Sequence, residues 1–181
     1  VDAGKVRFLG VSNFSIAQLE AARQASRHPI VSNQVRYNLV DRTIEGGLLD
    51  YCVRQHITVI AYSPLARLFS RILDGDPHGA LSALARKLDK TPAQIALNWC
   101  ICRNSLVAIP KAHSLERQLE NCAASGWYLS PEDRRRLDAE IEYRRRGLAD
   151  RLVRKCVPRS LSSTIRYAVQ CLPPSIRRRL N

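Results

Sequence analysis

The feature of this sequence that most constrains its fold is an alternation of short apolar runs with longer stretches of helical periodicity. Strands that alternate with helices indicate an α/β protein with a parallel sheet. Continuous apolar strands are typical of sheets that are buried on both faces. The four apolar runs are VRFLGV (6–11), IVSNQVRY (30–37), ITVIAYS (57–63) and SLVAIP (105–110).

The beginnings of the expected helices carry capping signals. SIAQ at 15–18 and TPAQ at 91–94 are capping boxes. In this motif a hydroxyl caps the helix, and the glutamine side chain bonds the backbone N–H of the capping residue. SPED at 130–133 begins another helix, with acids in the first turn, where they complement the helix dipole. Further helical patterns are EGGLLDYCVRQ (45–55), GALSALARKL (79–88) and SLERQLENCAAS (114–125).

Two architectures fit this alternation: an open doubly wound sheet and part of a (β/α)8 barrel. No G-x-G-x-x-G turn follows the first run, which disfavours the dinucleotide-binding form of the open sheet. The chain begins with Val1 and contains no methionine. Either an initiator residue was removed or misread, or this chain is a piece of a longer one.

Polar side chains lie where each apolar run ends. Because the carboxyl ends of parallel strands line the ligand site of such proteins, we expect a small-molecule site at this edge. The segment from Lys111 to Arg117 adds two cations at a helix N-terminus, which indicates a phosphate. The strand-end residues are Ser12 and Asn13, then Asn33 and Gln34 with Tyr37 and Asn38 beyond them, then Tyr62 and Ser63, and finally Lys111 with Ser114 beyond it.

Longer motifs resemble a known family. In order and spacing, GKVRFLGVSNFS, NQVRYNLVDR, VIAYSPLA, KTPAQIALNW and VAIPKAHSLERQLENCAASGWYLSPED resemble the C-terminal half of an aldo-keto reductase, from about residue 3 to about residue 143. The resemblance implies that residues 1–145 are four βα units of a (β/α)8 barrel and bind the cofactor. It also implies NADPH-dependent reduction of an aldehyde or ketone, a small-molecule carbonyl substrate, to an alcohol.

The same resemblance implies roles for individual residues. Ser12, Asn13 and Gln34 match the residues that hydrogen-bond the nicotinamide carboxamide, and Tyr62 matches the residue that stacks on the nicotinamide. Ser63 to Leu65 match the start of the loop under the pyrophosphate. At the adenosine end, Lys111, Ser114 and Arg117 match the group that binds the 2′-phosphate, and Glu120 and Asn121 match the pair that binds the adenine amino group.

The chain also departs from the family pattern. Ala66 stands where the family usually has glycine, and Ala112 replaces a residue that often carries a hydroxyl group. Residues 67–78 do not match a familiar form of the loop that closes over the cofactor. The family's catalytic Asp, Tyr, Lys and His lie on the first four strands, so we assign no catalytic residue here. We expect the chain alone to be inactive and to need a missing N-terminal half or a second copy of itself.

Residues 146–181 form a basic tail beyond the resemblance. They carry nine of the 29 Lys and Arg residues but only Asp150 of the 16 acids. The pattern predicts two short helices, at about 148–156 and 160–172. Three interpretations of the tail remain open: it is packed or solvated, it contacts a membrane surface or a protein, or it contacts nucleic-acid phosphates. The last is the least favoured, because no nucleic-acid motif is present.

A second function class therefore stays open beside the reductase: a non-catalytic nucleotide-binding or interaction module with a basic tail. The six cysteines show neither CxxC spacing nor clustering with histidine, so we expect reduced thiols and no bound metal. No apolar run approaches the ~20 residues of a membrane span, and no signal peptide is apparent. We expect a cytoplasmic protein.

Overall fold

The computed structural model describes residues 1–143. The two helices expected within residues 146–181, and the membrane, protein or nucleic-acid contacts considered for them, lie outside the described residues. Across residues 1–143, every helix is too short or too polar to span a membrane.

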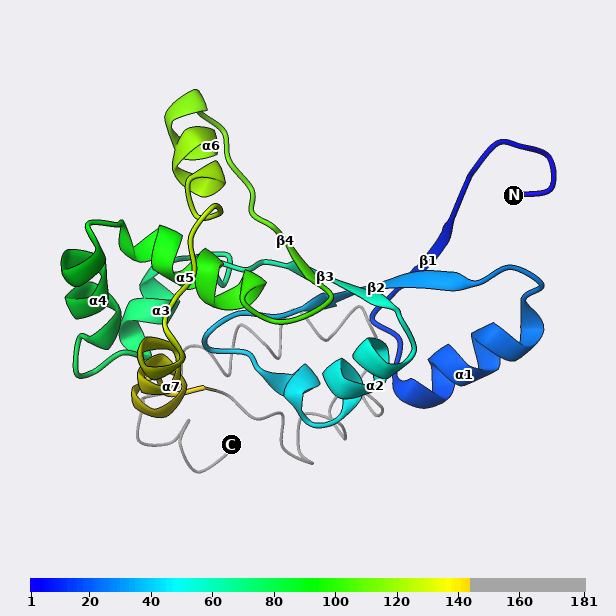
Figure 1. The fold of residues 1–181 in the computed structure, drawn as a ribbon, viewed down its shortest axis with the longest axis horizontal. Helices are drawn as coiled ribbons and strands as arrows, with labels where there is room; N and C mark the ends of the chain where they lie inside the picture. The colour runs from blue at the N-terminus through cyan, green and yellow to red at the C-terminus, as the bar shows by residue number, and fades with distance from the viewer. Residues whose placement is uncertain (144–181) are drawn as a thin grey trace, which may run out of the picture. The chain divides into compact units, whose positions relative to one another are not determined.

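Four parallel strands form one sheet, and their order across the sheet is their order along the chain (Figure 1). The parallel α/β prediction is confirmed. The first strand begins three residues later than the apolar run that predicted it, because Val6 and Phe8 are exposed. The strands are β1 (Leu9–Ser12), β2 (Ile30–Arg36), β3 (Thr58–Tyr62) and β4 (Leu106–Ile109).

Helices follow the strands, and their predicted caps are present. Ser15 with Gln18 and Thr91 with Gln94 form complete capping boxes, and the Ser130 hydroxyl accepts a hydrogen bond from the next turn. The helices are α1 (Ile16–Ala25), the 3-10 helix η1 (Thr43–Glu45), α2 (Leu48–Arg54), α3 (Ser70–Asp74), α4 (Ala80–Leu88), α5 (Pro92–Ile101), α6 (Leu115–Cys122) and α7 (Pro131–Glu140).

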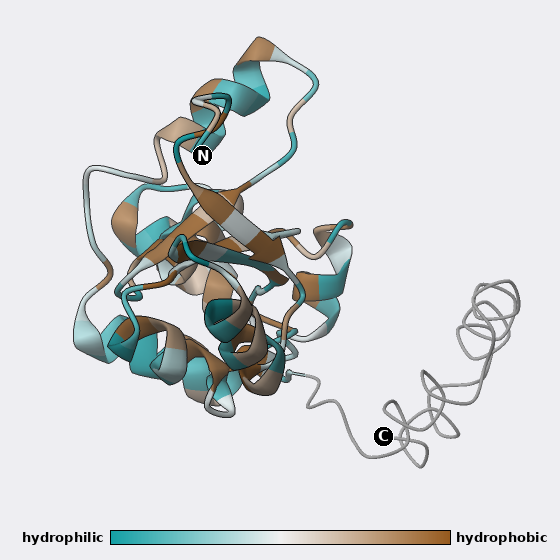
Figure 2. Ribbon diagram, turned by 90° about the vertical axis from the view of Figure 1, so that its right-hand side faces the viewer, coloured by the Kyte–Doolittle hydropathy of each residue, from teal (hydrophilic) through white to brown (hydrophobic). Residues whose placement is uncertain are grey.

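The sheet is buried on one face only, so the prediction of burial on both faces is wrong for the described residues. Successive residues of a strand point to opposite faces. Val59 and Leu106, which pair in register, are buried on the helix-covered face. On the other face Ile60 pairs with Val107, and Val107 and Ile109 are 51% and 44% exposed. Figure 2 shows how apolar residues run along the strands.

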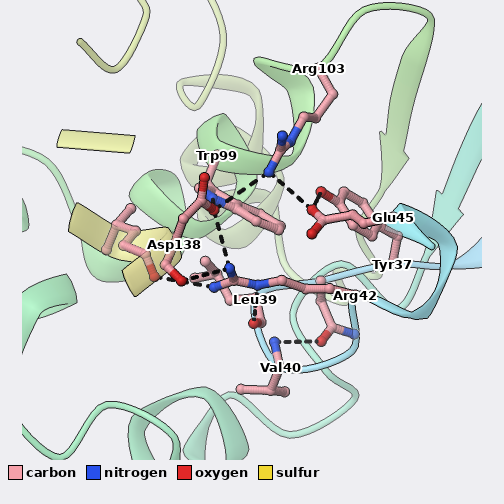
Figure 3. A network of polar contacts seen from close by, with 10 residues as sticks. Tyr37, Leu39, Val40, Arg42, Glu45, Trp99, Arg103 and Asp138 are labelled. Carbon is pink, nitrogen blue, oxygen red and sulfur yellow. Dashed lines mark hydrogen bonds and ion pairs between the residues drawn. The ribbon is translucent and has the colours of Figure 1, made fainter. Parts of the chain in front are cut away.

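A buried guanidinium joins the loop after β2 to α5 and α7 (Figure 3). Arg42, 4% exposed, donates hydrogen bonds to the carbonyl oxygens of Leu39 at 2.9 Å and Leu137 at 3.1 Å. It also donates to the Asp138 carboxylate at 3.2 Å. The guanidinium lies 4.8 Å from the centroid of the Trp99 ring, whose Nε1 donates to Asp138 Oδ1 at 2.8 Å. Arg42 is therefore held entirely by groups of the protein.

The same network extends to a second arginine. Arg103 donates to the carboxylate of Glu45 at 3.0 Å, and Glu45 also accepts a hydrogen bond from the Tyr37 hydroxyl. Tyr37 stacks on Trp99 with ring centroids 5.1 Å apart. Burial raises the pKa of Tyr37 far above its usual value, so the phenol stays neutral. We call this set the arginine cluster: Tyr37, Arg42, Glu45, Trp99, Arg103 and Asp138.

The cysteines within residues 1–143 are free thiols. Cys100 is fully buried, and burial raises its pKa to about 12, which makes this thiol unreactive at neutral pH. In the described part of the chain, no group of three or more His, Cys, Asp or Glu side chains could hold a metal ion.

Candidate functional site

The carboxyl ends of β1, β2 and β3 bring four predicted site residues together. The backbone N–H of Asn13 and the hydroxyl of Ser12 both donate to the Gln34 carbonyl, at 2.8 and 3.1 Å. The Asn13 amide donates to Ser12 Oγ at 3.0 Å and accepts from the Tyr62 hydroxyl at 3.1 Å. We call Ser12, Asn13, Gln34 and Tyr62 the rim cluster.

Left-handed backbone conformations turn the chain at two of these strand ends. Asn13 has a φ of +60°, and Ser63 has a φ of +51°. Asparagine adopts this conformation at a lower cost than most residues, because its short polar side chain can bond locally. The Ser-Asn pair therefore ends β1, leaves an amide at the edge of the sheet, and allows Ser15 to cap α1 two residues later.

Two buried asparagines hold these turns; both were expected among the polar residues at the end of the second run, but neither was assigned a role in cofactor binding. The Asn33 side chain accepts from the backbone N–H of Phe14 at 3.3 Å and donates to its carbonyl at 3.0 Å. The Asn38 side chain donates to the Ser63 carbonyl at 2.9 Å. Both lie in the motif that contains Gln34, and an amide inside an apolar run is the sequence signal for this role in holding the turns.

The loop after β3 contains a strained turn, which follows the residues predicted to pass under the pyrophosphate. Leu65 packs against the core and is partly buried. Ala66 and Arg67 both have positive φ, +57° and +65°. Ala66, where the family usually has glycine, thus adopts a conformation that glycine favours, at about 1–2 kcal/mol for a residue with a side chain.

The residues predicted for the adenosine end lie on α6 and just before it. The Ser114 hydroxyl caps α6 by accepting from the backbone N–H of Arg117 at 3.3 Å. Arg117 forms an ion pair with Glu120 at 2.6 Å. Partial burial raises the pKa of Glu120, but hydrogen bonds from Thr91 and Arg117 outweigh it and lower that pKa overall. Three of these residues are exposed (Lys111, Ser114 and Arg117) and two are half-buried (Glu120 and Asn121).

The structure thus forms two groups rather than one continuous network. Among residues 1–143, no hydrogen bond or ion pair joins the rim cluster to α6. Both groups follow the carboxyl ends of parallel strands, so they belong to the same edge of the sheet. Figures 1 and 2 both show α6 projecting from the rest of the chain, and Gln94 of α5 contacts its Glu120 carbonyl at 3.2 Å.

A further charged residue at this edge was not predicted. Arg36, the last residue of β2, pairs in register with Tyr62 of β3. Its guanidinium carbon lies 5.6 Å from the centroid of the Tyr62 ring. A single arginine at a strand end is also typical of a solvated position, so the sequence alone does not distinguish Arg36 as a site residue.

Comparisons with known proteins identify the family of this chain. The sequence model of the aldo/keto reductase family matches residues 1–142. Glyoxal reductase of Bacillus subtilis is 36% identical over 137 residues, which cover 75% of this chain and 46% of that protein. This chain spans about half the length of the curated relatives it matches.

Solved structures agree in fold. A thermostable aldo-keto reductase bound to the inhibitor epalrestat superposes with a TM-score of 0.71 at 40% identity, over 76% of this chain and 50% of that one. An aldo-keto reductase from Klebsiella pneumoniae in complex with NADPH gives a TM-score of 0.70 at 35% identity, over 80% and 51%. The four parallel βα units correspond to about half of such a barrel, and the chain belongs to the aldo/keto reductase family of oxidoreductases.

Proposed function

We propose that residues 1–145 form the cofactor-binding half of an NADPH-dependent reductase that converts an aldehyde or ketone to an alcohol. The rim cluster carries the proposal, because it gathers amide and hydroxyl groups beside an aromatic ring at one sheet edge. NADPH supplies the hydride that such a reduction needs. The NADPH complex of the Klebsiella pneumoniae protein and the glyoxal reductase activity named for the Bacillus subtilis relative support the proposal.

At the nicotinamide end, the rim cluster matches the chemistry of a carboxamide, which both donates and accepts hydrogen bonds. The Asn13 amide uses one donor on Ser12 and one acceptor site for Tyr62, and both partners are exchangeable at this exposed edge. Ser12, Asn13 and Gln34 would hold the carboxamide and so fix which ring face meets the substrate. Tyr62 would offer its ring for stacking.

At the adenosine end, a cation and a helix N-terminus offer complementary binding to a phosphate. The Arg117 side chain is 65% exposed, and its Nη1 bonds Glu120, so its other donors are available to a 2′-phosphate. Lys111 and Ser114 would complete that contact. Glu120 and Asn121 would bind the adenine amino group, and Ser63 to Leu65 would pass under the pyrophosphate.

We infer that a further four βα units complete the enzyme and carry its proton-donating group. Parallel sheets are found covered on both faces, whereas one face here exposes Val107 and Ile109. β1 and β4 each have one unpaired edge within the described sheet. On α6, Leu115 and Leu119 are 70% and 61% exposed at helical spacing. A complementary half-barrel would cover all three surfaces.

NADPH binding by the purified chain, followed by quenching of tryptophan fluorescence, tests the cofactor assignment. We expect saturable binding that is weaker for NADH, and an Arg117→Ala variant that loses affinity for NADPH more than for NADH. Arg54→Ala, which removes an exposed arginine from the end of α2, is the matched control. A chain that is folded by circular dichroism and binds neither nucleotide would refute the proposal.

Activity measurements test the second half of the proposal. The chain alone should not consume NADPH with a small aldehyde such as methylglyoxal. Mixing it with a polypeptide that holds the first four strands of a related reductase should restore NADPH consumption. Turnover by the isolated chain, or by a dimer of it in gel filtration, would show instead that its own residues supply the proton.

A further inference from the structure

We propose that Arg36 makes the site prefer the reduced over the oxidised cofactor, by placing a positive charge beside the nicotinamide. The inference rests on the proposed function, because it requires the nicotinamide to stack on Tyr62. It assigns a specificity-determining role to a residue outside the rim cluster.

The geometry places Arg36 against the stacking residue. Arg36 and Tyr62 are register partners on neighbouring strands, so their side chains leave the same face of the sheet. Gln34, two residues earlier on β2, shares that face. The guanidinium carbon is 5.6 Å from the Tyr62 ring centroid, which is within the range of a cation–π contact. The charge is thus fixed beside the ring by β2 itself.

No acid neutralises this charge in the described chain. Within residues 1–143, none of the ion pairs includes Arg36, and its Nε is buried without a hydrogen-bond partner. The rim cluster contains no carboxylate. Arg42 and Arg103, by contrast, each pair with an acid. The Arg36 charge therefore acts on whatever stacks against Tyr62.

The two redox forms of the cofactor differ in charge at that position. The oxidised nicotinamide ring carries a positive charge, and the reduced ring is neutral. Stacked aromatic rings lie with centroids about 4.5–7 Å apart, so an oxidised ring on Tyr62 would lie within roughly 13 Å of the guanidinium. Repulsion at that range, in the intermediate dielectric of a rim, corresponds to about a threefold to tenfold loss of affinity for the oxidised form.

This preference has a direct use in a reductase. NADPH would bind without repulsion, and NADP+ would form next to a cation that disfavours it. Arg36 would therefore hasten release of the spent cofactor.

Dissociation constants for NADPH and NADP+ test the inference, on the full chain and on Arg36→Gln, Arg36→Lys and Arg54→Gln. The contacts of the adenosine end are common to both forms and cancel in the ratio of the two constants. Arg36→Gln should lower the ratio of the NADP+ constant to the NADPH constant about threefold to tenfold, by tightening NADP+. Arg36→Lys keeps the charge, and Arg54→Gln removes an equal charge from the distant end of α2, so both should keep the ratio.

A salt series on the unaltered chain gives an independent result that does not depend on any variant folding. Because screening weakens repulsion, a higher salt concentration should lower the wild-type ratio and leave the Arg36→Gln ratio nearly constant. If both forms bind and the ratio changes neither with salt nor in Arg36→Gln, the role of Arg36 is refuted while the cofactor proposal stands. If the folded chain binds neither form, the proposed function itself is refuted.

Discussion

The rim cluster and the arginine cluster are both polar networks, but they use their hydrogen-bonding groups differently. Arg42 lies buried at the centre of the arginine cluster and donates to three backbone carbonyls (Leu39, Leu137 and Asp138) and to the Asp138 carboxylate. In the rim cluster, Ser12 and Asn13 are exposed and bond mainly to each other and to a neighbouring strand end. A network whose polar groups are all satisfied by buried protein groups stabilises the fold. A network whose exposed hydrogen bonds can be replaced by bonds to a ligand is suited to binding.

Removal of the central guanidinium should give the largest effect on stability. Arg42→Ala removes a buried guanidinium that donates to three backbone carbonyls and to the Asp138 carboxylate, which keeps only Trp99 and Arg103 as donors. We expect a loss of about 3–5 kcal/mol in the free energy of unfolding. Urea unfolding followed by tryptophan fluorescence measures it. Arg136→Ala, which breaks an exposed pair with Glu140, should change stability by about 0.5 kcal/mol or less. Equal losses in the two variants would show that the arginine cluster stabilises the fold no more than an exposed ion pair does.

The opposite behaviour is expected of the rim cluster. Asn13→Gly removes the amide but tolerates the positive φ at this position, so stability should change by about 0.5 kcal/mol or less. The affinity for NADPH should fall about tenfold, which corresponds to about 1.4 kcal/mol. Fluorescence titration and urea unfolding of the same sample separate the two quantities. Asn104→Gly, an exposed asparagine ahead of β4, is the control and should leave NADPH binding unchanged.

Acid should lower the contribution of the ion pair between Lys87 and Asp133 of α7 to the free energy of unfolding. A hydrogen bond from Lys87 at 2.8 Å lowers the pKa of the buried Asp133 carboxyl, and burial opposes that change less strongly. A lowered folded-state pKa stabilises the protein above the ordinary value of about 3.9 and loses that contribution as pH falls below it. The urea concentration at the midpoint of unfolding should therefore fall less steeply between about pH 5 and pH 3 in Lys87→Gln than in the unaltered chain.

Lys90→Gln provides the comparison for this pH series. Lys90 lies over the Trp127 ring and pairs with no carboxylate within residues 1–143, so its replacement should leave the acid dependence as it is. If both lysine variants follow the curve of the unaltered chain, the pair between Lys87 and Asp133 does not contribute to stability.

The smallest effect should come from strain beside the rim. Arg67 is exposed and has a φ of +65°, and Arg67→Gly should stabilise the chain by about 0.5 kcal/mol, because relief of strain exceeds the added entropy of the unfolded glycine. Thermal unfolding measures the change. Arg71→Gly lies inside α3 and should have the opposite sign, a loss of about 1 kcal/mol. A destabilising Arg67→Gly would indicate that the arginine side chain, and not the backbone, maintains the loop.

The local parts of this structure were predictable, and the long-range parts were not. Capping boxes at Ser15 and Thr91 and the four apolar runs predicted helices and strands because these signals lie within a few residues. Strand ends of a parallel sheet share one edge, so the rim cluster followed from the runs alone. Arg42 could not be found in the same way, because its partners Leu137 and Asp138 lie 95 and 96 positions away. Burial of the second sheet face likewise depends on groups outside each strand.

The order of the strands also bears on how the chain reaches this structure. Leu9 pairs with Ile30, 21 positions later, and Asn33 pairs with Val59, 26 positions later. Val59 pairs with Leu106 across 47 positions, which contain α3, α4 and α5. Loop-closure entropy must be overcome before distant pairings form, so folding slows as sequence separation grows. We therefore expect β1, β2 and β3 to assemble first, so that the rim cluster, proposed for the nicotinamide, exists before β4 and α6 add the residues proposed for the adenosine end.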